Sequence, residues 1–121
     1  MNKDSRSLLN KVLKLIFDLS VTDLEIFETL LREFDKRKEP LSVLDIVTVT
    51  GKSRSTVERS LFKLFTMGLV ERKAVLARSG GYTYVYFPKP MDEIREILKL
   101  RLDEFCSNVK RILDETEMFK S

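Results

Sequence analysis

Basic and hydroxyl side chains alternate near the middle of the chain, and this combination is suited to binding anions. The side chains are Lys52, Ser53, Arg54, Ser55, Thr56 and Arg59, followed by Lys63, Arg72, Lys73 and Arg78. A guanidinium group binds phosphate oxygens or a guanine edge through paired hydrogen bonds, and short hydroxyls donate to phosphate. Residues 51–90 hold eight basic and two acidic side chains, whereas residues 1–50 and 91–121 are slightly acidic. The middle of the chain is therefore a candidate site for a polyanion, with a solvated face neutralised by acidic neighbours as the competing explanation.

The composition excludes most catalytic chemistry. Among the 121 residues there is no histidine and a single cysteine, Cys106, which rules out Ser-His and Cys-His catalysis and zinc sites built on cysteine pairs. We expect no enzymatic activity, no metal and no cofactor. A lone cysteine is usually a small apolar filler, with thiol sensing as the alternative. No apolar run is long enough to span a membrane and the start of the chain lacks a signal pattern, so we expect a cytoplasmic protein.

Two helices are expected before the basic segment. Residues 5–17 carry a wide apolar face, and a second helix starts at a capping box formed by Thr22 and Glu25. Val21 and Ile26 flank this start at the positions of a hydrophobic staple. The second helix ends before Pro40, because the residue before a proline is pushed out of the helical region.

The basic segment is introduced by two short helices joined by a tight turn. Ser42 and Asp45 form a capping box, and Gly51 stands where a left-handed residue closes a helix. The next helix starts at Ser53 or, alternatively, at Ser55. Its apolar stripe consists of Val57, Leu61, Leu64 and Phe65. Two short helices separated by a glycine-containing turn of this length are typical of a helix-turn-helix.

The apolar stripe leaves the other side of this helix to the basic side chains. Arg54 and Arg59 are the candidates for contacts with guanine or phosphate. Glu58 either accepts a hydrogen bond from cytosine or, as we prefer, caps the helix or pairs with one of these arginines. The role of Phe62 is ambiguous. It points away from the stripe together with the basic side chains, but it could equally pack beneath the hairpin that follows.

A β-hairpin is expected next. Residues 69–76 and 82–87 flank Gly80-Gly81, which can take the positive φ angles of a tight turn. The second strand is dense in aromatic and β-branched residues, which suit a pleated surface. Tyr82, Tyr84 and Tyr86 alternate onto one face, and we expect them to be buried against helices rather than to form a stacking platform for single strands. Arg78 lies at the tip, where it is best placed to reach a minor groove.

Residues 91–121 are expected to form one long helix with an apolar seam. The seam alternates steps of three and four residues and is interrupted by the polar residues Arg95 and Thr116. Its apolar positions are Met91, Leu98, Leu102, Phe105, Val109, Ile112 and Phe119. A helix of this length, ~45 Å, projects beyond a core this small, so the seam needs cover. We expect a second copy of the chain to supply it through Leu98, Leu102, Phe105, Val109, Ile112 and Phe119. The alternative is that the seam packs on the chain's own first helix.

These elements predict a mainly α fold of the α+β winged-helix class, in which a helix-turn-helix core carries a β-hairpin wing and long terminal helices form a dimer. We divide the chain into a supporting N-terminal helix (1–20), a winged helix-turn-helix domain (21–90) and a C-terminal dimerisation helix (91–121). A winged helix presents one helix to the major groove of DNA, so the expected partner is double-stranded DNA.

The sequence Ser-Arg-Ser-Thr-Val-Glu-Arg at 53–59, followed by Gly-Leu-Val-Glu-Arg at 68–72, resembles the winged-helix transcriptional regulators of the MarR, TrmB and ArsR type, especially their short archaeal members. The resemblance spans about residues 20–90. It implies that the helix carrying residues 53–59 enters the major groove, that the wing acts through Arg78, and that the terminal helices form a homodimer. The chain lacks the paired cysteines and histidines of metal-sensing ArsR-like members.

We therefore expect a homodimeric regulator that binds double-stranded DNA sequence-specifically, without catalytic activity and without a membrane partner. Two alternatives remain open at this point. One is a chromatin-like protein that coats DNA without sequence preference, and the other is a winged-helix module that binds proteins. The sequence identifies no small-molecule effector.

Overall fold

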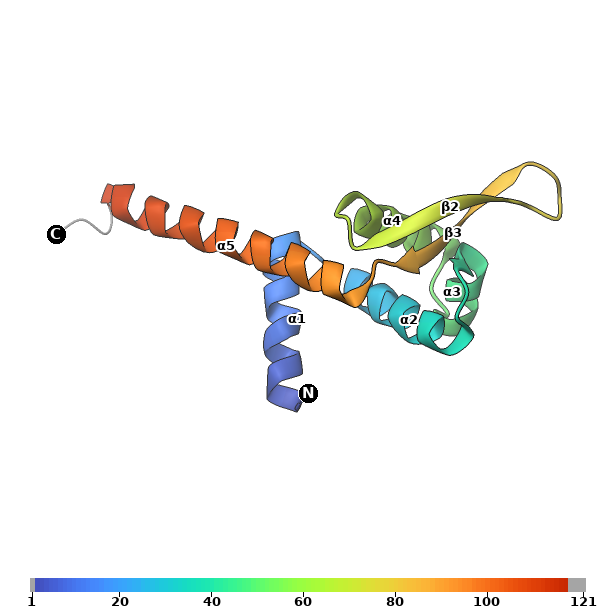
Figure 1. Cartoon of the computed structure of the whole chain (residues 1–121), viewed down its shortest axis with the longest axis horizontal. Coiled ribbons are helices and arrows are strands. Elements are labelled where there is room, and N and C mark those ends of the chain that lie inside the picture. The colour runs from blue at the N-terminus through green and yellow to red at the C-terminus, as the bar shows by residue number, and fades with distance from the viewer. Residues whose placement is uncertain (1, 118–121) are drawn as a thin grey trace.

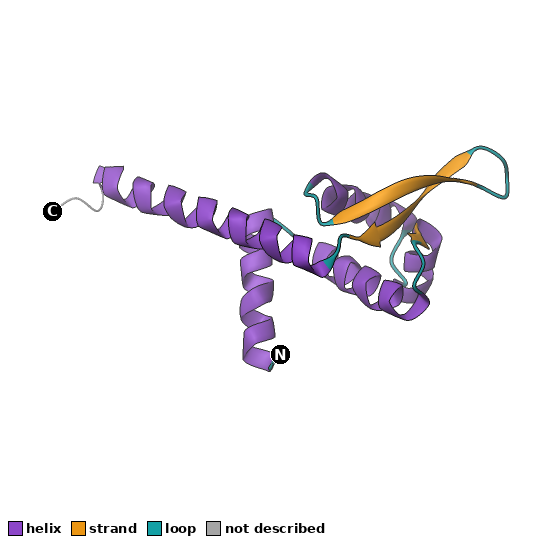
Figure 2. Cartoon of the chain, viewed as in Figure 1, coloured by secondary structure: helices purple, strands orange, loops and turns teal. Residues whose placement is uncertain are grey.

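The structure, a computed structural model, describes residues 2–117 and confirms the winged-helix fold (Figures 1 and 2). In this range the elements follow one another as α1 (Lys3–Phe17), α2 (Val21–Arg37), β1 (Leu41–Ser42), α3 (Val43–Thr50), α4 (Arg54–Thr66), β2 (Val70–Leu76), β3 (Tyr82–Pro88) and α5 (Met91–Glu115). The wing consists of β2, β3 and the turn between them. The molecule is elongated, because α5 and the wing project from opposite ends of the core (Figure 1). None of the described helices is long and apolar enough to cross a membrane.

The core lies where α2, α3 and α4 meet the base of the sheet. Its fully buried side chains come from all of these elements: Ile26, Leu30, Leu41, Ile46, Val57, Leu61, Leu64, Leu69 and Val70. Each large aliphatic side chain removed from water stabilises the fold by about 1.5–3 kcal/mol. The stripe predicted on α4 is the part of this core that holds the helix in place, although Phe65 is only partly buried.

The start of α2 differs from the predicted capping box. Ser20 is the N-cap, its hydroxyl accepting a hydrogen bond from the Asp23 amide at 3.0 Å, while the Asp23 carboxylate accepts one from the Ser20 amide at 3.0 Å. The prediction of Thr22 and Glu25 is therefore wrong by two residues. The physical reason is the staple: Leu19 and Leu24 flank the observed cap and are both buried, whereas Val21 is exposed.

The sheet has three antiparallel strands in the order β1-β3-β2. The wing register pairs Leu76 with Tyr82, Ala74 with Tyr84 and Arg72 with Tyr86. The short strand β1 was not predicted from the sequence. It pairs Leu41 with Tyr86, which ties the base of the wing to the start of α3.

The three tyrosines of β3 lie on the same face of the strand but differ in burial. Tyr86 is buried, as predicted. Tyr84 and Tyr82 are 45% and 80% exposed, so the expectation that all three are buried is wrong. The reason is length: the hairpin extends beyond the helices, and only its base has a helix to pack against (Figure 1).

Helix α5 is divided into a packed first part and an exposed remainder. Ile94 is buried, and Ile97 and Leu98 pack against the core. The Arg101 guanidinium lies 5.7 Å from the ring centroid of Phe17 at the end of α1. Beyond this point the seam is open, since Leu102, Val109 and Ile112 are all exposed and Phe105 is half-buried.

The end of α5 is also shorter than predicted. The helix finishes at Glu115, with the backbone of Thr116 extended at φ −78° and ψ 123°. Phe119, predicted as part of the seam, lies outside the described residues. Only part of the seam predicted for dimerisation is free to meet a second copy, because Leu98 packs against its own core, whereas the described positions from Leu102 to Ile112 are not part of that core.

Candidate nucleic-acid interface

The helix-turn-helix is built by local hydrogen bonds. The Ser42 and Asp45 capping box predicted for α3 is present, and Gly51 closes that helix at φ 71°. Ser53, not Ser55, is the N-cap of α4, its hydroxyl accepting from the Thr56 amide at 3.2 Å. A side chain at Gly51 would meet no other atom, but the backbone would be strained, because L-residues rarely adopt this φ.

The predicted contact side chains of α4 point away from the core. The Arg54 side chain is 74% exposed, and Ser55 and Arg59 are also exposed. Hydroxyls of Ser53 and Thr56 lie 2.8 Å apart in the first turn, where unpaired backbone N–H groups and the helix dipole favour a negatively charged ligand. The N-terminal turns of α4 therefore present cations, hydroxyls and amides on one exposed surface.

Neither arginine is buried against an acidic group. The Arg54 Nε lies 3.0 Å from Glu58 Oε1, the pairing preferred from the sequence, and the Arg59 Nε donates to the Ser55 carbonyl oxygen at 3.5 Å. An exposed ion pair of this kind contributes only about 0–1 kcal/mol. A phosphate or base edge can therefore replace Glu58 as the partner of Arg54 at little cost.

Lys52 is anchored at the edge of this surface. Its Nζ lies 2.7 Å from Glu25 Oε2 of α2, and its side chain is only partly exposed. The pair connects the turn to α2 and leaves the lysine beside the N-terminus of α4. Lys52 thus helps to position the turn against α2 and also adds a positive charge beside the N-terminus of α4.

Lys63 is turned inward, away from the surface predicted for it. Its Nζ lies 3.1 Å from Asp23 Oδ2 and also donates to the Asp18 carbonyl oxygen. Asp23 further accepts a hydrogen bond from the Ser60 hydroxyl at 2.6 Å. The reason is position on the helix, since Ser60 and Lys63 are three residues apart and face the N-terminus of α2.

The carboxyl group of Asp23 is held in its charged form. Burial by itself would raise its pKa, but hydrogen bonds from Ser60, from Ser20 and from Lys63 outweigh that effect, so the pKa lies below the ordinary value of 3.8. The buried network therefore fixes the middle of α4 against α2 and contributes no free charge to the exposed surface.

Arg72 is the second predicted contact that the structure places elsewhere. Its guanidinium carbon lies 4.3 Å from the ring centroid of Phe65 and 4.1 Å from that of Tyr84, with Phe62 at 5.8 Å. This stack joins α4 to the wing through cation–π contacts. Lys73 and Arg78 are exposed on the wing as predicted, and Gly80 and Gly81 form its turn at φ 88° and 71°.

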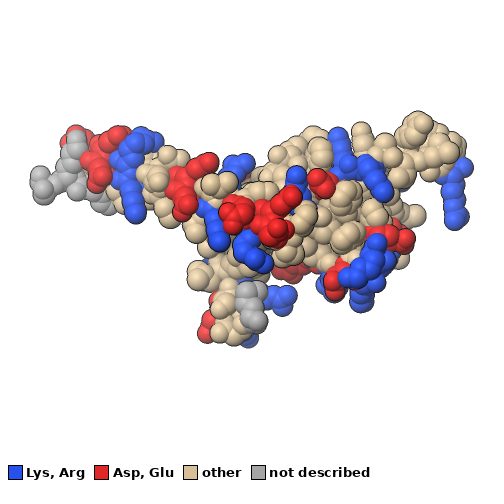
Figure 3. Space-filling model, viewed as in Figure 1, with Lys and Arg blue, Asp and Glu red and all other residues tan. Residues whose placement is uncertain are grey.

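The wing carries no acidic residue beyond its base. Residues 72–90 include Arg72, Lys73, Arg78 and Lys89 but neither aspartate nor glutamate. In Figure 3 the distal half of the wing shows basic and uncharged atoms on the face in view, whereas α5 shows acidic side chains interspersed with basic ones. The charge asymmetry read from the sequence is therefore also an asymmetry in space.

Comparison with known proteins decides the family. The family model described as "Sugar-specific transcriptional regulator TrmB" matches residues 13–92, which include the whole helix-turn-helix and the wing. The chain belongs to the TrmB family of transcriptional regulators. The resemblance derived from the residues at 53–59 and 68–72 is thereby confirmed.

Relatives of this TrmB-family chain include archaeal proteins. It is 34% identical over 102 residues to the protein MJ1503 of Methanocaldococcus jannaschii, an alignment covering 84% of this chain and 74% of that one. The structure described as a possible transcriptional regulator from Methanosarcina mazei superposes with a TM-score of 0.77 at 22% identity, covering 90% and 88% of the two chains. The S. aureus MepR–DNA complex superposes with a TM-score of 0.53 at 14% identity, covering 92% and 90%. At these identities the two solved structures share the fold.

The TrmB-family chain also has a groove between α4 and the wing that sequence reasoning missed. It has a volume of about 260 Å³ and is lined by Val43, Arg54, Glu58, Phe62, Thr83, Tyr84 and Tyr86. Phe62 lines its α4 side and is exposed, which resolves the ambiguity over its environment. The alternation of tyrosines in β3 was the available sign, but it did not reveal how far the wing extends beyond the helix.

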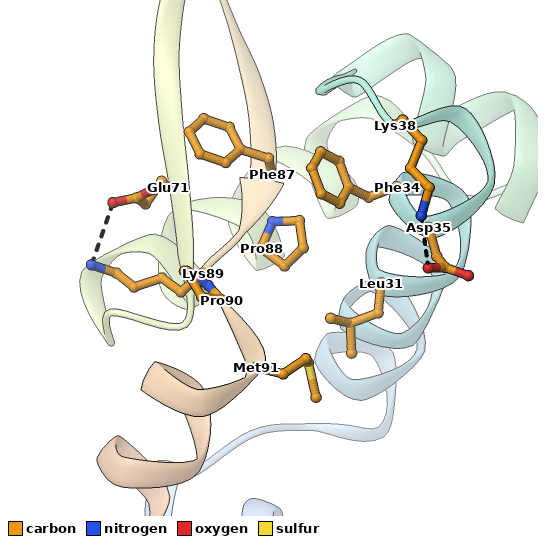
Figure 4. Close-up of a pocket in the computed structure, with 10 residues that line it drawn as sticks. All are labelled: Leu31, Phe34, Asp35, Lys38, Glu71, Phe87, Pro88, Lys89, Pro90 and Met91. Carbon is orange, nitrogen blue, oxygen red and sulfur yellow. Dashed lines mark hydrogen bonds and ion pairs between the residues drawn. The ribbon is translucent and has the colours of Figure 1, made fainter.

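A larger pocket lies at the junction of α2, β3 and α5 (Figure 4). Its volume is about 620 Å³, and Leu31, Phe34, Phe87, Pro88 and Met91 line its apolar part. The rings of Phe34 and Phe87 are 6.4 Å apart. Its charged residues are paired with one another, Lys38 with Asp35 at 3.2 Å and Lys89 with Glu71 at 3.6 Å. The pocket therefore presents mainly apolar surface to any ligand.

Proposed function

We propose that this TrmB-family chain is a sequence-specific regulator that binds double-stranded DNA as a homodimer, with α4 in the major groove and the wing in the minor groove. The observation that carries the proposal is the exposed surface that the first turns of α4 share with the wing, which has no acidic residue beyond Glu71 at its base. Arg54 and Arg59 are the proposed base or phosphate contacts. Lys52, Ser53, Ser55 and Thr56 are proposed to hold phosphate at the helix N-terminus, and Lys73 and Arg78 to contact DNA from the wing.

Two residues of the predicted set are not proposed as DNA contacts. The Lys63 ammonium is occupied by Asp23, and the Arg72 guanidinium is stacked between rings. Both are proposed to orient the elements that do make contact. The remaining basic side chains suffice for a salt-dependent interface, because each neutralised phosphate contributes a slope of ~−0.9 in log K against log salt.

Dimerisation is proposed through the exposed part of the α5 seam, namely Leu102, Phe105, Val109 and Ile112. Helix α1 also exposes apolar residues, Leu8 and Leu15, which a second copy could cover. A two-fold dimer places two recognition helices about one DNA turn, ~34 Å, apart. The preferred DNA site is therefore an imperfect inverted repeat.

Selection from a random duplex library tests the proposal. Fragments retained by the full chain at moderate salt should converge on an inverted repeat and bind ~10³-fold more tightly than random DNA. Equal binding of all duplexes would favour a chromatin-like protein instead. Failure to bind any duplex at low salt would favour the protein-binding module.

Arg54→Ala and Arg59→Ala test the recognition helix. Each should weaken binding to the selected duplex by roughly 10-fold or more, because one bidentate contact is worth ~1–3 kcal/mol. Both side chains are exposed, so thermal unfolding should stay nearly unchanged. Lys14→Ala on α1 is the matched control and should bind as the parent chain does. Unaltered affinity in both arginine variants would refute this assignment of α4.

A further inference from the structure

The outer half of the wing exposes a pair of large apolar side chains. Leu76 is 73% exposed and Tyr82 is 80% exposed. They are direct cross-strand partners, so their side chains lie together on one face of the ribbon. Packing within the described chain does not account for them, because the helices that cover the base of the wing do not extend to its outer half (Figure 1).

This pair lies on the face of the wing that looks toward α4. Side chains alternate across a strand, so Leu76 shares its face with Arg72, and Tyr82 shares its face with Tyr84. At the base of that face, the Arg72 guanidinium is stacked on the ring of Phe65 of α4 and on the ring of Tyr84. The groove between α4 and the wing, lined by Arg54 and Tyr84 among others, joins the two surfaces. The apolar pair therefore continues the surface proposed to bind DNA.

The charge of the wing indicates which kind of ligand this face binds. The segment 72–90 carries four cations and no acidic residue, which suits a polyanion. The minor groove is ~6 Å wide, and proteins that bind it often place apolar side chains between base steps next to basic ones. A ribbon bearing Leu76 and Tyr82 at its end and Arg78 in its turn has this combination.

We propose that Leu76 and Tyr82 form an apolar wedge that enters the minor groove of duplex DNA and partly unstacks one base step beside the site read by α4. This inference rests on the proposed function and adds a second source of sequence preference. Pyrimidine–purine steps such as TA unstack most easily, so the wedge favours them without hydrogen bonds to base edges.

A tryptophan probe tests the wedge directly, because the natural chain contains no tryptophan. Tyr82→Trp in the full chain should lose emission and become protected from acrylamide when a 30-base-pair duplex containing the selected site is added. Val75→Trp, next to Leu76 in β2 and on the opposite face of the ribbon, is the matched control and should change little. Duplex binding is followed in parallel by anisotropy of a label on the DNA.

The outcomes separate the two proposals. Duplex binding with unchanged Tyr82→Trp emission overturns the wedge and leaves the proposed function standing. Failure of the unmodified chain to bind any duplex overturns both. A change in the sedimentation of Leu76→Ser with unchanged duplex affinity identifies the face as a contact between copies and also overturns the wedge.

Salt dependence supplies a second readout. Leu76→Ser and Tyr82→Ser should each weaken binding about tenfold, because each variant loses the burial of one large apolar side chain in the complex. The salt slope should stay unchanged. Arg78→Ala should instead reduce the slope by about one. Loss of slope in the serine variants would mean that they disturb the phosphate contacts, and would refute a separate apolar contribution.

Discussion

At the scale of single residues, Asp23 is a buried carboxylate that accepts hydrogen bonds from both α4 and the start of α2. Its carboxylate completes the capping box of α2 by accepting a hydrogen bond from the Ser20 amide, and it also accepts hydrogen bonds from Ser60 and Lys63 of α4. The carboxylate thus joins the helix at the centre of the core to the proposed recognition helix. Since a buried charge without partners is costly, this network specifies one orientation of α4 rather than a range.

Asp23→Asn should reduce the free energy of unfolding by about 1–3 kcal/mol at pH 7, because the amide cannot satisfy the same donors. The folded-state pKa of Asp23 is lowered, so the carboxylate stabilises the fold above its ordinary value of 3.8, and that contribution is lost as the pH falls further. Urea unfolding at pH 7 and at pH 3 should show the two proteins converging in acid. Asp35→Asn is the control, since that side chain is exposed, and a constant difference at both pH values would contradict the role of the charge.

At the scale of elements, Arg72 couples the wing to α4. Its guanidinium lies between Phe65 on the helix and Tyr84 on the adjacent strand. A hairpin that extends beyond the core has few other contacts to define its direction, because β1 pairs only with its base. The stack therefore contributes to the angle at which the wing leaves the helix.

Arg72→Met should loosen the wing while leaving the core intact. The substitution keeps an apolar stem but removes a cation–π contact worth ~1–2 kcal/mol. Amide hydrogen exchange should become faster in β2 and β3 but not in α2, and Arg72→Lys should have an intermediate effect. Lys73→Met, on the opposite face and exposed, is the comparison variant. Equal exchange rates in the wings of Arg72→Met and the parent chain would disprove the coupling.

At the scale of the whole molecule, the apolar seam on α5 is exposed to solvent along most of its described length. Its first turns pack on the core, but Leu102, Val109 and Ile112 remain in contact with water. In the proposed dimer, a second copy covers this seam and supplies a second copy of α4. DNA affinity and oligomeric state are then linked, because two half-sites held together bind as a bivalent ligand.

Val109→Glu should convert the proposed dimer into a monomer and weaken binding to the inverted repeat by roughly 10²-fold. Sedimentation and anisotropy measure the two effects. Lys110→Ala, the neighbouring exposed position off the seam, is the control and should remain dimeric. A Val109→Glu protein that sediments as the parent does would show that copies associate through another surface.

The sequence alone determined the parts of this protein that depend on near neighbours. Ser42, Asp45 and Gly51 define the helix-turn-helix through hydrogen bonds and a backbone conformation confined to a few residues, and Gly80-Gly81 defines the hairpin in the same way. The family resemblance at 53–59 follows the same local pattern and is confirmed. These features were predictable because each is stabilised within one turn of chain.

Only the tertiary structure decided where the basic side chains point. Lys63 and Asp23 are 40 residues apart in sequence, and Arg72 meets rings from both α4 and β3, so no local pattern distinguishes these cations from Arg54 or Arg78. The same holds for the cap at Ser20, selected over Thr22 by the burial of Leu19, and for the exposure of Tyr82 beyond the end of the helices. In each case packing between distant segments determines the environment, because burial depends on what lies opposite in space and not on what is adjacent in the chain.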